Sequence, residues 1–153
     1  MSEVRTCLWY DGQAEEAAAL YCNLLPDSEI SKVDRPAPDA PAVLVYFTLM
    51  GVPYTALNGG PGCPHTIAAS IATHLDSQEA ADTLYDALVA AGSTESMCGW
   101  ITDPFGLSWQ VIPPGLPDAL FEGTAEQNQR AFAEMQTQKK LNVAAIVAAR
   151  DTT

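Results

Sequence analysis

The most informative segment of this sequence is Asp103-Pro104-Phe105-Gly106-Leu107-Ser108-Trp109-Gln110-Val111-Ile112-Pro113. Pro104 fixes φ and Gly106 permits a positive φ, so the segment predicts a turn at its start. The residues after the turn alternate as they do in a half-buried strand. One face of this strand would carry Leu107, Trp109 and Val111, and the other face Ser108, Gln110 and Ile112. The segment therefore predicts a hairpin turn and the last strand of a domain.

The composition indicates a globular protein. The chain has 153 residues, of which 48% are hydrophobic and 17% charged, so we expect a single domain, 1–153, with a buried core. No apolar run approaches the length of about 18 residues that a membrane span needs. The start, Met1 to Arg5, lacks the basic and apolar regions of a signal peptide. We expect a cytoplasmic protein whose cysteines, Cys7, Cys22, Cys63 and Cys98, stay reduced and form no zinc motif.

The charge pattern excludes two classes of partner. The formal net charge is −12, and no basic side chain occurs between Arg35 and Arg130. A protein that binds nucleic acid needs clustered Lys and Arg to neutralise phosphates, so we expect no nucleic-acid partner. An anionic membrane surface is disfavoured for the same reason.

The same order of elements is predicted twice. Periodicity predicts strand, helix and three strands at residues 4–10, 14–25, 28–33, 43–49 and 54–57. After the Gly-rich break at Asn58 to Gly62, strand, helix and three strands follow at 67–74, 80–91, 94–97, 99–102 and 107–112. Asp76 is the expected N-cap of the second helix, and Gly92 its end. We therefore predict an α+β fold of two βαβββ half-repeats, about 3–58 and 66–113.

Residue pairs support the repeat, and a tail follows it. Asp11-x-Gln13 with Tyr21 matches Asp76-x-Gln78 with Tyr85, and a Gly-rich linker between two half-sheets argues for a cleft between them. The tail, about 118–150, should start a helix at Thr124 with its apolar residues spread along it: Phe132, Met135, Val143 and Ile146. Such a helix would pack either on the back of the sheet or on another subunit.

Several strings resemble one known branch of proteins. The βαβββ–βαβββ order is similar to the vicinal-oxygen-chelate superfamily, which includes glyoxalase I, bleomycin-resistance proteins and extradiol dioxygenases. The branch that the strings resemble is the PhnB-like proteins, often labelled 3-demethylubiquinone-9 3-methyltransferase. The matching strings are Leu8 to Ala17, Ala56 to Pro61, Cys98-Gly99-Trp100, Phe105 to Val111, and the tail residues Lys139-Lys140-Leu141 and Ala144-Ala145-Ile146.

The residues argue against both the methyltransferase label and the metal chemistry of the superfamily. A methyltransferase usually binds its cofactor at a Gly-rich turn that follows a strand, and this sequence has no G-x-G-x-x-G. The resemblance implies metal ligands on the first and last strands of each half, but Gln110 stands where a Glu is expected and Ala68 where a His is expected. In the first half the corresponding positions are Arg5, Thr6 and Thr55, which are not usual ligands. His65 falls in a loop and His74 at a strand end. We expect no metal and no cofactor.

The predicted cleft is neutral. Alternation places Cys7 and Trp9 with Ser70, Ser108 and Gln110 on the inner face, and Leu8, Ile71, Trp109 and Val111 under the helices, although a slip of one residue would exchange the sets. The candidate ligand-binding residues are Cys7, Trp9, Asn58, Ser70, Ser108 and Gln110.

Two functions are compatible with this cleft. One is a non-catalytic protein that binds a small neutral or aromatic molecule, and the other is a metal-dependent enzyme with an unusual ligand set. The resemblance also implies a homodimer.

Overall fold

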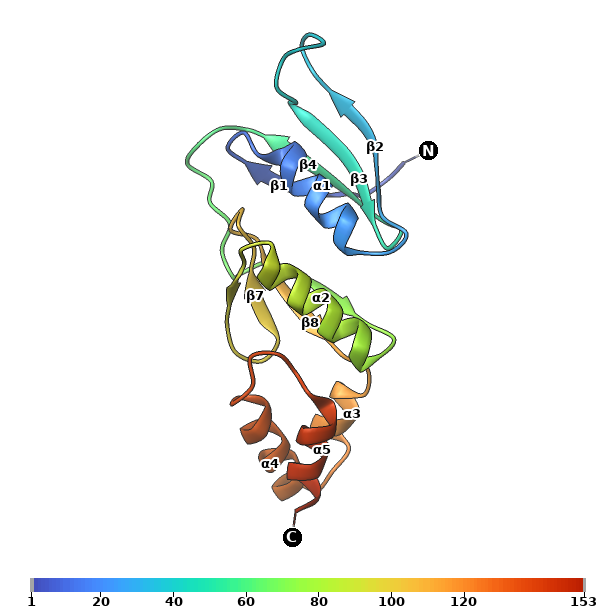
Figure 1. Ribbon diagram of the computed structural model, residues 1–153, viewed down its shortest axis with the longest axis vertical. Coiled ribbons are helices and arrows are strands. Elements are labelled where there is room, and N and C mark those ends of the chain that lie inside the picture. The colour runs from blue at the N-terminus through green and yellow to red at the C-terminus, as the bar shows by residue number, and fades with distance from the viewer. Residues whose placement is uncertain (1, 153) are drawn as a thin grey trace. The chain divides into compact units, whose positions relative to one another are not determined.

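The computed structural model describes residues 2–152 and divides the chain into two compact units, Met1–His65 and Thr66–Thr153. Each unit carries one predicted repeat (Figure 1). The first contains, in chain order, β1 (Thr6–Tyr10), α1 (Ala14–Leu24), β2 (Glu29–Asp34), β3 (Leu44–Leu49) and β4 (Val52–Asn58). The second contains β5 (Ser70–His74), α2 (Gln78–Ala90), β6 (Thr94–Glu95), β7 (Trp100–Thr102) and β8 (Ser108–Ile112), followed by α3 (Leu116–Phe121), α4 (Ala125–Met135) and α5 (Val143–Asp151).

The two sheets have the same topology. Their strand orders are β1-β4-β3-β2 and β5-β8-β7-β6. In each sheet the first and last strands of the repeat run parallel, and the other neighbours are antiparallel. This arrangement confirms the predicted α+β fold of two βαβββ repeats. Among the helices of residues 2–152, none is long and apolar enough to cross a bilayer.

Small residues allow α1 to lie close to its sheet. Ala14, Ala17 and Ala18 are fully buried, and the sheet contributes the buried residues Leu8, Tyr10, Val45, Phe47 and Ala56. The Tyr10 and Tyr21 hydroxyls lie 3.0 Å apart, which satisfies two polar groups inside this core.

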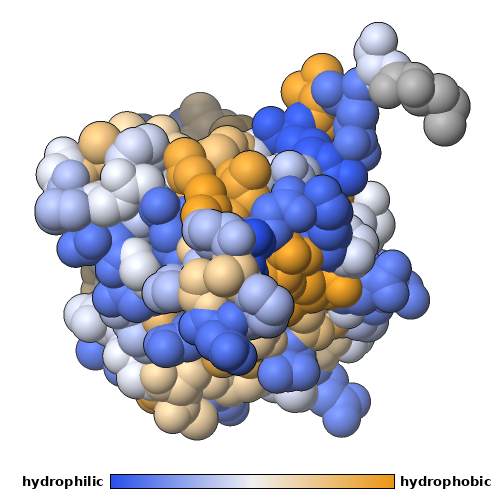
Figure 2. Space-filling view, turned by 90° about the horizontal axis from the view of Figure 1, so that it is seen from above, coloured by the Kyte–Doolittle hydropathy of each residue, from blue (hydrophilic) through white to orange (hydrophobic). Residues whose placement is uncertain are grey.

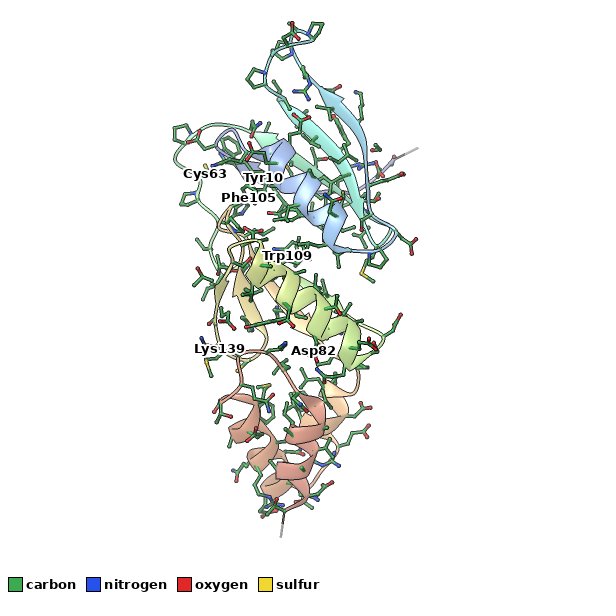
Figure 3. The ribbon with its side chains drawn as sticks, in the orientation of Figure 1. Tyr10, Cys63, Asp82, Phe105, Trp109 and Lys139 are labelled. Carbon is green, nitrogen blue, oxygen red and sulfur yellow. The ribbon has the colours of Figure 1, made fainter. Side chains whose placement is uncertain are left out.

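The predicted turn at Asp103 is confirmed, and the Asp103 side chain stabilises the turn. Asp103 Oδ1 accepts hydrogen bonds from the backbone N–H of Phe105 (2.9 Å) and of Leu107 (3.0 Å), and Oδ2 accepts one from Trp109 Nε1 (3.0 Å). Trp109 is fully buried on the face of β8 that packs under α2 (Figure 3).

Three local predictions are wrong. The strand predicted at 67–74 begins at Ser70, and Ile67 before it is 76% exposed. The strand predicted at 94–97 contains only Thr94–Glu95. The N-cap of α2 is Ser77 rather than Asp76, because the Ser77 hydroxyl is placed to accept the N–H of Ala80 at 3.0 Å.

The tail forms three helices of the second unit. The helix start predicted at Thr124 is confirmed, because Thr124 is the N-cap of α4 and forms a capping box with Gln127. The chain leaves this helix after Met135 and starts another at Val143. The apolar residues of these helices and of the segment between α4 and α5 pack on one another and on Ile112 in a small core: Leu116, Ala119, Leu120, Ala131, Phe132, Met135, Leu141, Val143, Ile146 and Val147. The tail apolar residues therefore pack within this unit.

Candidate functional site

The candidate residues lie where alternation predicted them within each sheet. Leu8, Ile71, Trp109 and Val111 are buried on the helix-covered faces, whereas Cys7 and Trp9 alternate with Leu8 on β1 and lie on the face away from α1. In the second unit the face away from α2, here called the far face, carries Ser70, Ala72, Trp100, Thr102, Ser108 and Gln110.

A hydrogen bond joins two of the candidates on the far face. Gln110 Nε2 donates to Ser70 Oγ at 2.9 Å. Ser70 pairs with Ser108 in the register, so Gln110 reaches it diagonally from β8 to β5. Within residues 2–152, no donor reaches Gln110 Oε1, which leaves this acceptor able to bind a ligand.

A pocket of about 280 Å³ opens beside the far face. Its lining comes from the β6–β7 loop, β7, the start of β8 and the segment before β5: Ile67, Ser96, Met97, Cys98, Trp100, Ile101, Thr102 and Ser108. None of these residues is charged. Trp100 also pairs with Gln110 across the strands, so the amide adjoins the pocket wall.

In the first unit, the polar groups of the candidate residues Trp9 and Asn58 already form hydrogen bonds within the protein. Trp9 Nε1 donates to Gly60 O at 2.7 Å, and a Cβ added to Gly59 would overlap the indole. Asn58 Oδ1 accepts the N–H of Ala14 at 2.9 Å, and its Nδ2 donates to Ala42 O at 2.9 Å. The structure thus brings Ser70, Ser108 and Gln110 together on the far face, and places Trp9 and Asn58 in the packing of the β4 end. Cys7 is exposed on β1.

The donor atoms around Gln110 do not fit a tightly bound transition metal. Zinc and its neighbours prefer imidazole, thiolate or carboxylate ligands, whereas the far face offers amide and hydroxyl oxygens and one imidazole, that of His74 at the end of β5. Among residues 2–152, no three His, Cys, Asp or Glu side chains form a group that could hold a metal ion.

Sequence reasoning missed most of the pocket. Met97, Cys98, Trp100 and Thr102 were not among the predicted site residues, although 99–102 was predicted as a strand. Alternation in that strand places Trp100 and Thr102 on one face, but only the pairing of β7 with β8 shows that this face is the one carrying Gln110.

The chain matches the family model described as 3-demethylubiquinone-9 3-methyltransferase over residues 2–112. It matches no curated protein. Among solved structures, a PhnB protein from Bacillus cereus has 26% sequence identity and a TM-score of 0.65, with 73% of this chain and 99% of that chain covered. A protein from Pseudomonas aeruginosa has 23% identity and a TM-score of 0.60, with 74% and 98% covered.

The fosfomycin resistance protein FosX from Listeria monocytogenes shares the fold. It has 14% identity and a TM-score of 0.57, with 78% of this chain and 96% of that chain covered. A structure of FosX in complex with Mn(II) and sulfate has 14% identity and a TM-score of 0.52, with 71% and 88% covered.

Proposed function

Because this chain belongs to the PhnB-like family described as 3-demethylubiquinone-9 3-methyltransferase, within the vicinal-oxygen-chelate superfamily, we propose that it binds a small neutral or aromatic molecule. The observation that carries the proposal is the uncharged lining of the pocket beside the far face of the second sheet. Burying an unpaired charge in such a pocket is costly, so an uncharged ligand is favoured.

The pocket offers two kinds of contact. Trp100 provides an aromatic wall on which a planar molecule can stack. Gln110 lies beside this lining, paired with Trp100. Its Nε2 is held by Ser70, and its Oε1 accepts a hydrogen bond from a ligand hydroxyl or amine. Ser108 lines the pocket and adds a hydroxyl that can donate or accept. In the first unit, Cys7 and Trp9 stay candidate contacts.

The test is a binding assay with a neutral aromatic probe, 1-aminoanthracene, followed by a thermal-shift screen of neutral metabolites. Gln110→Leu removes one hydrogen bond and is expected to weaken binding of a hydrogen-bonding ligand about tenfold. Trp100→Ala is expected to weaken binding of the probe at least as much, because it removes the stacking surface.

A matched control keeps this test specific. Gln136→Leu makes the same change at an exposed position on the tail and should leave affinity unchanged. If Trp9→Ala lowers affinity while Trp100→Ala does not, the ligand site lies in the first unit and the proposed pocket is wrong.

A metal-dependent enzyme is the second candidate, and the FosX complex with Mn(II) favours it. Elemental analysis of protein purified without added metal separates the two. We expect no stoichiometric divalent ion, since the donors around Gln110 are weak ligands. About one tightly held Mn, Fe, Ni or Zn per chain would support the enzyme instead.

We do not assign the methyltransferase activity in the family description. S-adenosylmethionine usually binds on a doubly wound parallel sheet at a Gly-rich turn, and this chain has two mixed four-stranded sheets. We further propose that the protein is a homodimer. We also propose a reducing, cytoplasmic location, and the four free cysteines support this location.

A further inference from the structure

The segment Gln138 to Val143, which follows α4 and ends at the first residue of α5, is here called the strap. It lies outside residues 2–112, the part of the chain that the family model matches. The strap contacts the chain on both sides: one side touches the pocket rim, Met97 to Trp100, and the other touches α2. Lys139 of the strap and Asp82 of α2 are labelled in Figure 3.

Backbone hydrogen bonds attach the strap to the rim. The N–H of Cys98 donates to Gln138 O at 2.7 Å, and the N–H of Gly99 donates to Lys139 O at 2.8 Å. Leu141 is buried against Gly99 so closely that a Cβ there would lie 2.8 Å from Leu141 Cδ1. The two donors of the rim are consecutive, so the strap holds two adjacent N–H groups of the rim.

The rim needs such support because its backbone is strained. Cys98 has φ of +61° and Gly99 has φ of +77°. A non-glycine residue in the left-handed region persists only where its surroundings hold it. The strap provides the two backbone acceptors that stabilise this conformation.

Gln78 attaches the other side of the strap to α2. Its Nε2 donates to Leu141 O at 2.7 Å, and its Oε1 accepts the N–H of Val143 at 3.2 Å. Two ion pairs also hold the strap: Lys140 pairs with Asp86 of α2 at 2.7 Å, and Lys139 pairs with Glu95 of β6 at 3.6 Å. Both pairs are exposed enough that solvent weakens them, so the amide of Gln78 is the main connection.

We propose that the strap is a positioning element of the ligand pocket. It holds the rim in the conformation that accepts a ligand, and Gln78, which lies on α2 and outside the pocket lining, thereby controls affinity. The inference rests on the proposed function, because it concerns the same pocket. Gln78 is a positioning residue and does not contact the ligand.

The test combines thiol labelling with binding of 1-aminoanthracene. Gln78→Leu removes both side-chain bonds to the strap at nearly constant volume, together with the bond that Gln78 Nε2 donates to Asp82 Oδ1 on the same helix (2.9 Å). We expect Cys98, which is half-buried in the wild type, to react with N-ethylmaleimide about tenfold faster in the variant, the change that corresponds to the loss of one net hydrogen bond. Affinity for the probe should fall by a similar factor.

Two controls separate loosening of the rim from general unfolding. Gln13→Leu changes the counterpart of Gln78 in the first repeat, where the side chain is exposed and does not cap its helix, and should change neither reading. The labelling rate of half-buried Cys22, followed by mass spectrometry in the same samples, should stay constant in Gln78→Leu.

Each result has a distinct meaning. An unchanged Cys98 rate shows that the strap does not hold the rim and overturns the inference. A faster Cys98 rate with unchanged probe affinity also overturns it, while the proposed function stands. If the wild-type protein binds neither the probe nor any screened metabolite, the proposed function fails, and this inference fails with it.

Discussion

At the residue scale, the carboxylate of Asp103 connects the turn to the strand that follows it. It accepts hydrogen bonds from the backbone N–H groups of Phe105 and Leu107 and from the Trp109 indole. We expect Asp103→Asn to lower the free energy of unfolding by about 2 kcal/mol, because an amide oxygen replaces a charged acceptor and an NH₂ group faces donors. Urea denaturation measures this change. Asp39→Asn, at an exposed loop position, should change stability by less than about 0.5 kcal/mol.

Tyr85 makes stability depend on alkaline pH. Burial, with the nearby Glu95 carboxylate, raises its pKa to about 12. The folded protein thus favours the neutral phenol, so this stabilisation is complete below the pKa of an unfolded tyrosine, about 10, and is lost as the pH rises through about 12. We expect Tyr85→Phe, which removes the 3.2 Å hydrogen bond to Glu95, to flatten the loss of stability between these values. If the free energy of unfolding falls equally steeply with pH in the wild type and in Tyr85→Phe, the expectation is contradicted.

At the element scale, Asn58 holds the start of α1. Its amide caps Ala14 and also binds Ala42 O, whereas Gln13 at the N-cap position makes no side-chain cap. We expect Asn58→Ala to lower the free energy of unfolding by about 2 kcal/mol, since two hydrogen bonds are lost. Asn142→Ala, which removes one ordinary cap from α5, should cost about 1 kcal/mol.

The same variant tests the ligand role predicted for Asn58. Because the protein itself engages both polar groups of this side chain, we expect probe affinity to be unchanged once the folded fraction is accounted for. A loss of affinity in folded Asn58→Ala would place Asn58 in the ligand site.

At the scale of the whole molecule, the chain has two compact units but is expected to unfold as one. The first unit, Met1–His65, has a size at which a hydrophobic core is only marginally stable alone. Trp9 reports on the first unit, whereas Trp100 and Trp109 report on the second. In Trp9→Phe the remaining tryptophan fluorescence reports on the second unit, and in Trp100→Phe/Trp109→Phe it reports on the first. In each variant we expect the urea midpoint measured by fluorescence to coincide with the midpoint measured by circular dichroism. Separate midpoints within one variant would show independent units.

Assembly is the second prediction at this scale. Cyclic dimers are the commonest closed oligomers, and we expect light scattering at micromolar concentrations to give twice the 16.3 kDa mass of one chain. Figure 2 shows hydrophilic and hydrophobic residues interspersed on one face of the molecule. Val43, Met50 and Val52 are among the exposed apolar residues of the first unit. A single-chain mass across that range would contradict the prediction.

The sequence by itself determined the repeat and the faces of its strands. A period of two in β1 and β8 and the helical spacing of Ala14, Ala17 and Tyr21 are local, so they can be read without knowing any partner. The turn at Asp103 and the helix start at Thr124 are local for the same reason.

Only the tertiary structure decided which residues share the pocket and what supports them. Trp100 lies beside Gln110 because β7 pairs with β8 in one register, and Gln78 meets Leu141 across 63 positions of sequence. Local periodicity predicts neither contact, because each contact depends on how distant segments bury their apolar faces together. The strap shows this most clearly: the sequence predicted one loosely packed helix there, and tertiary hydrogen bonds to the rim and to α2 keep residues 138–142 out of a helix.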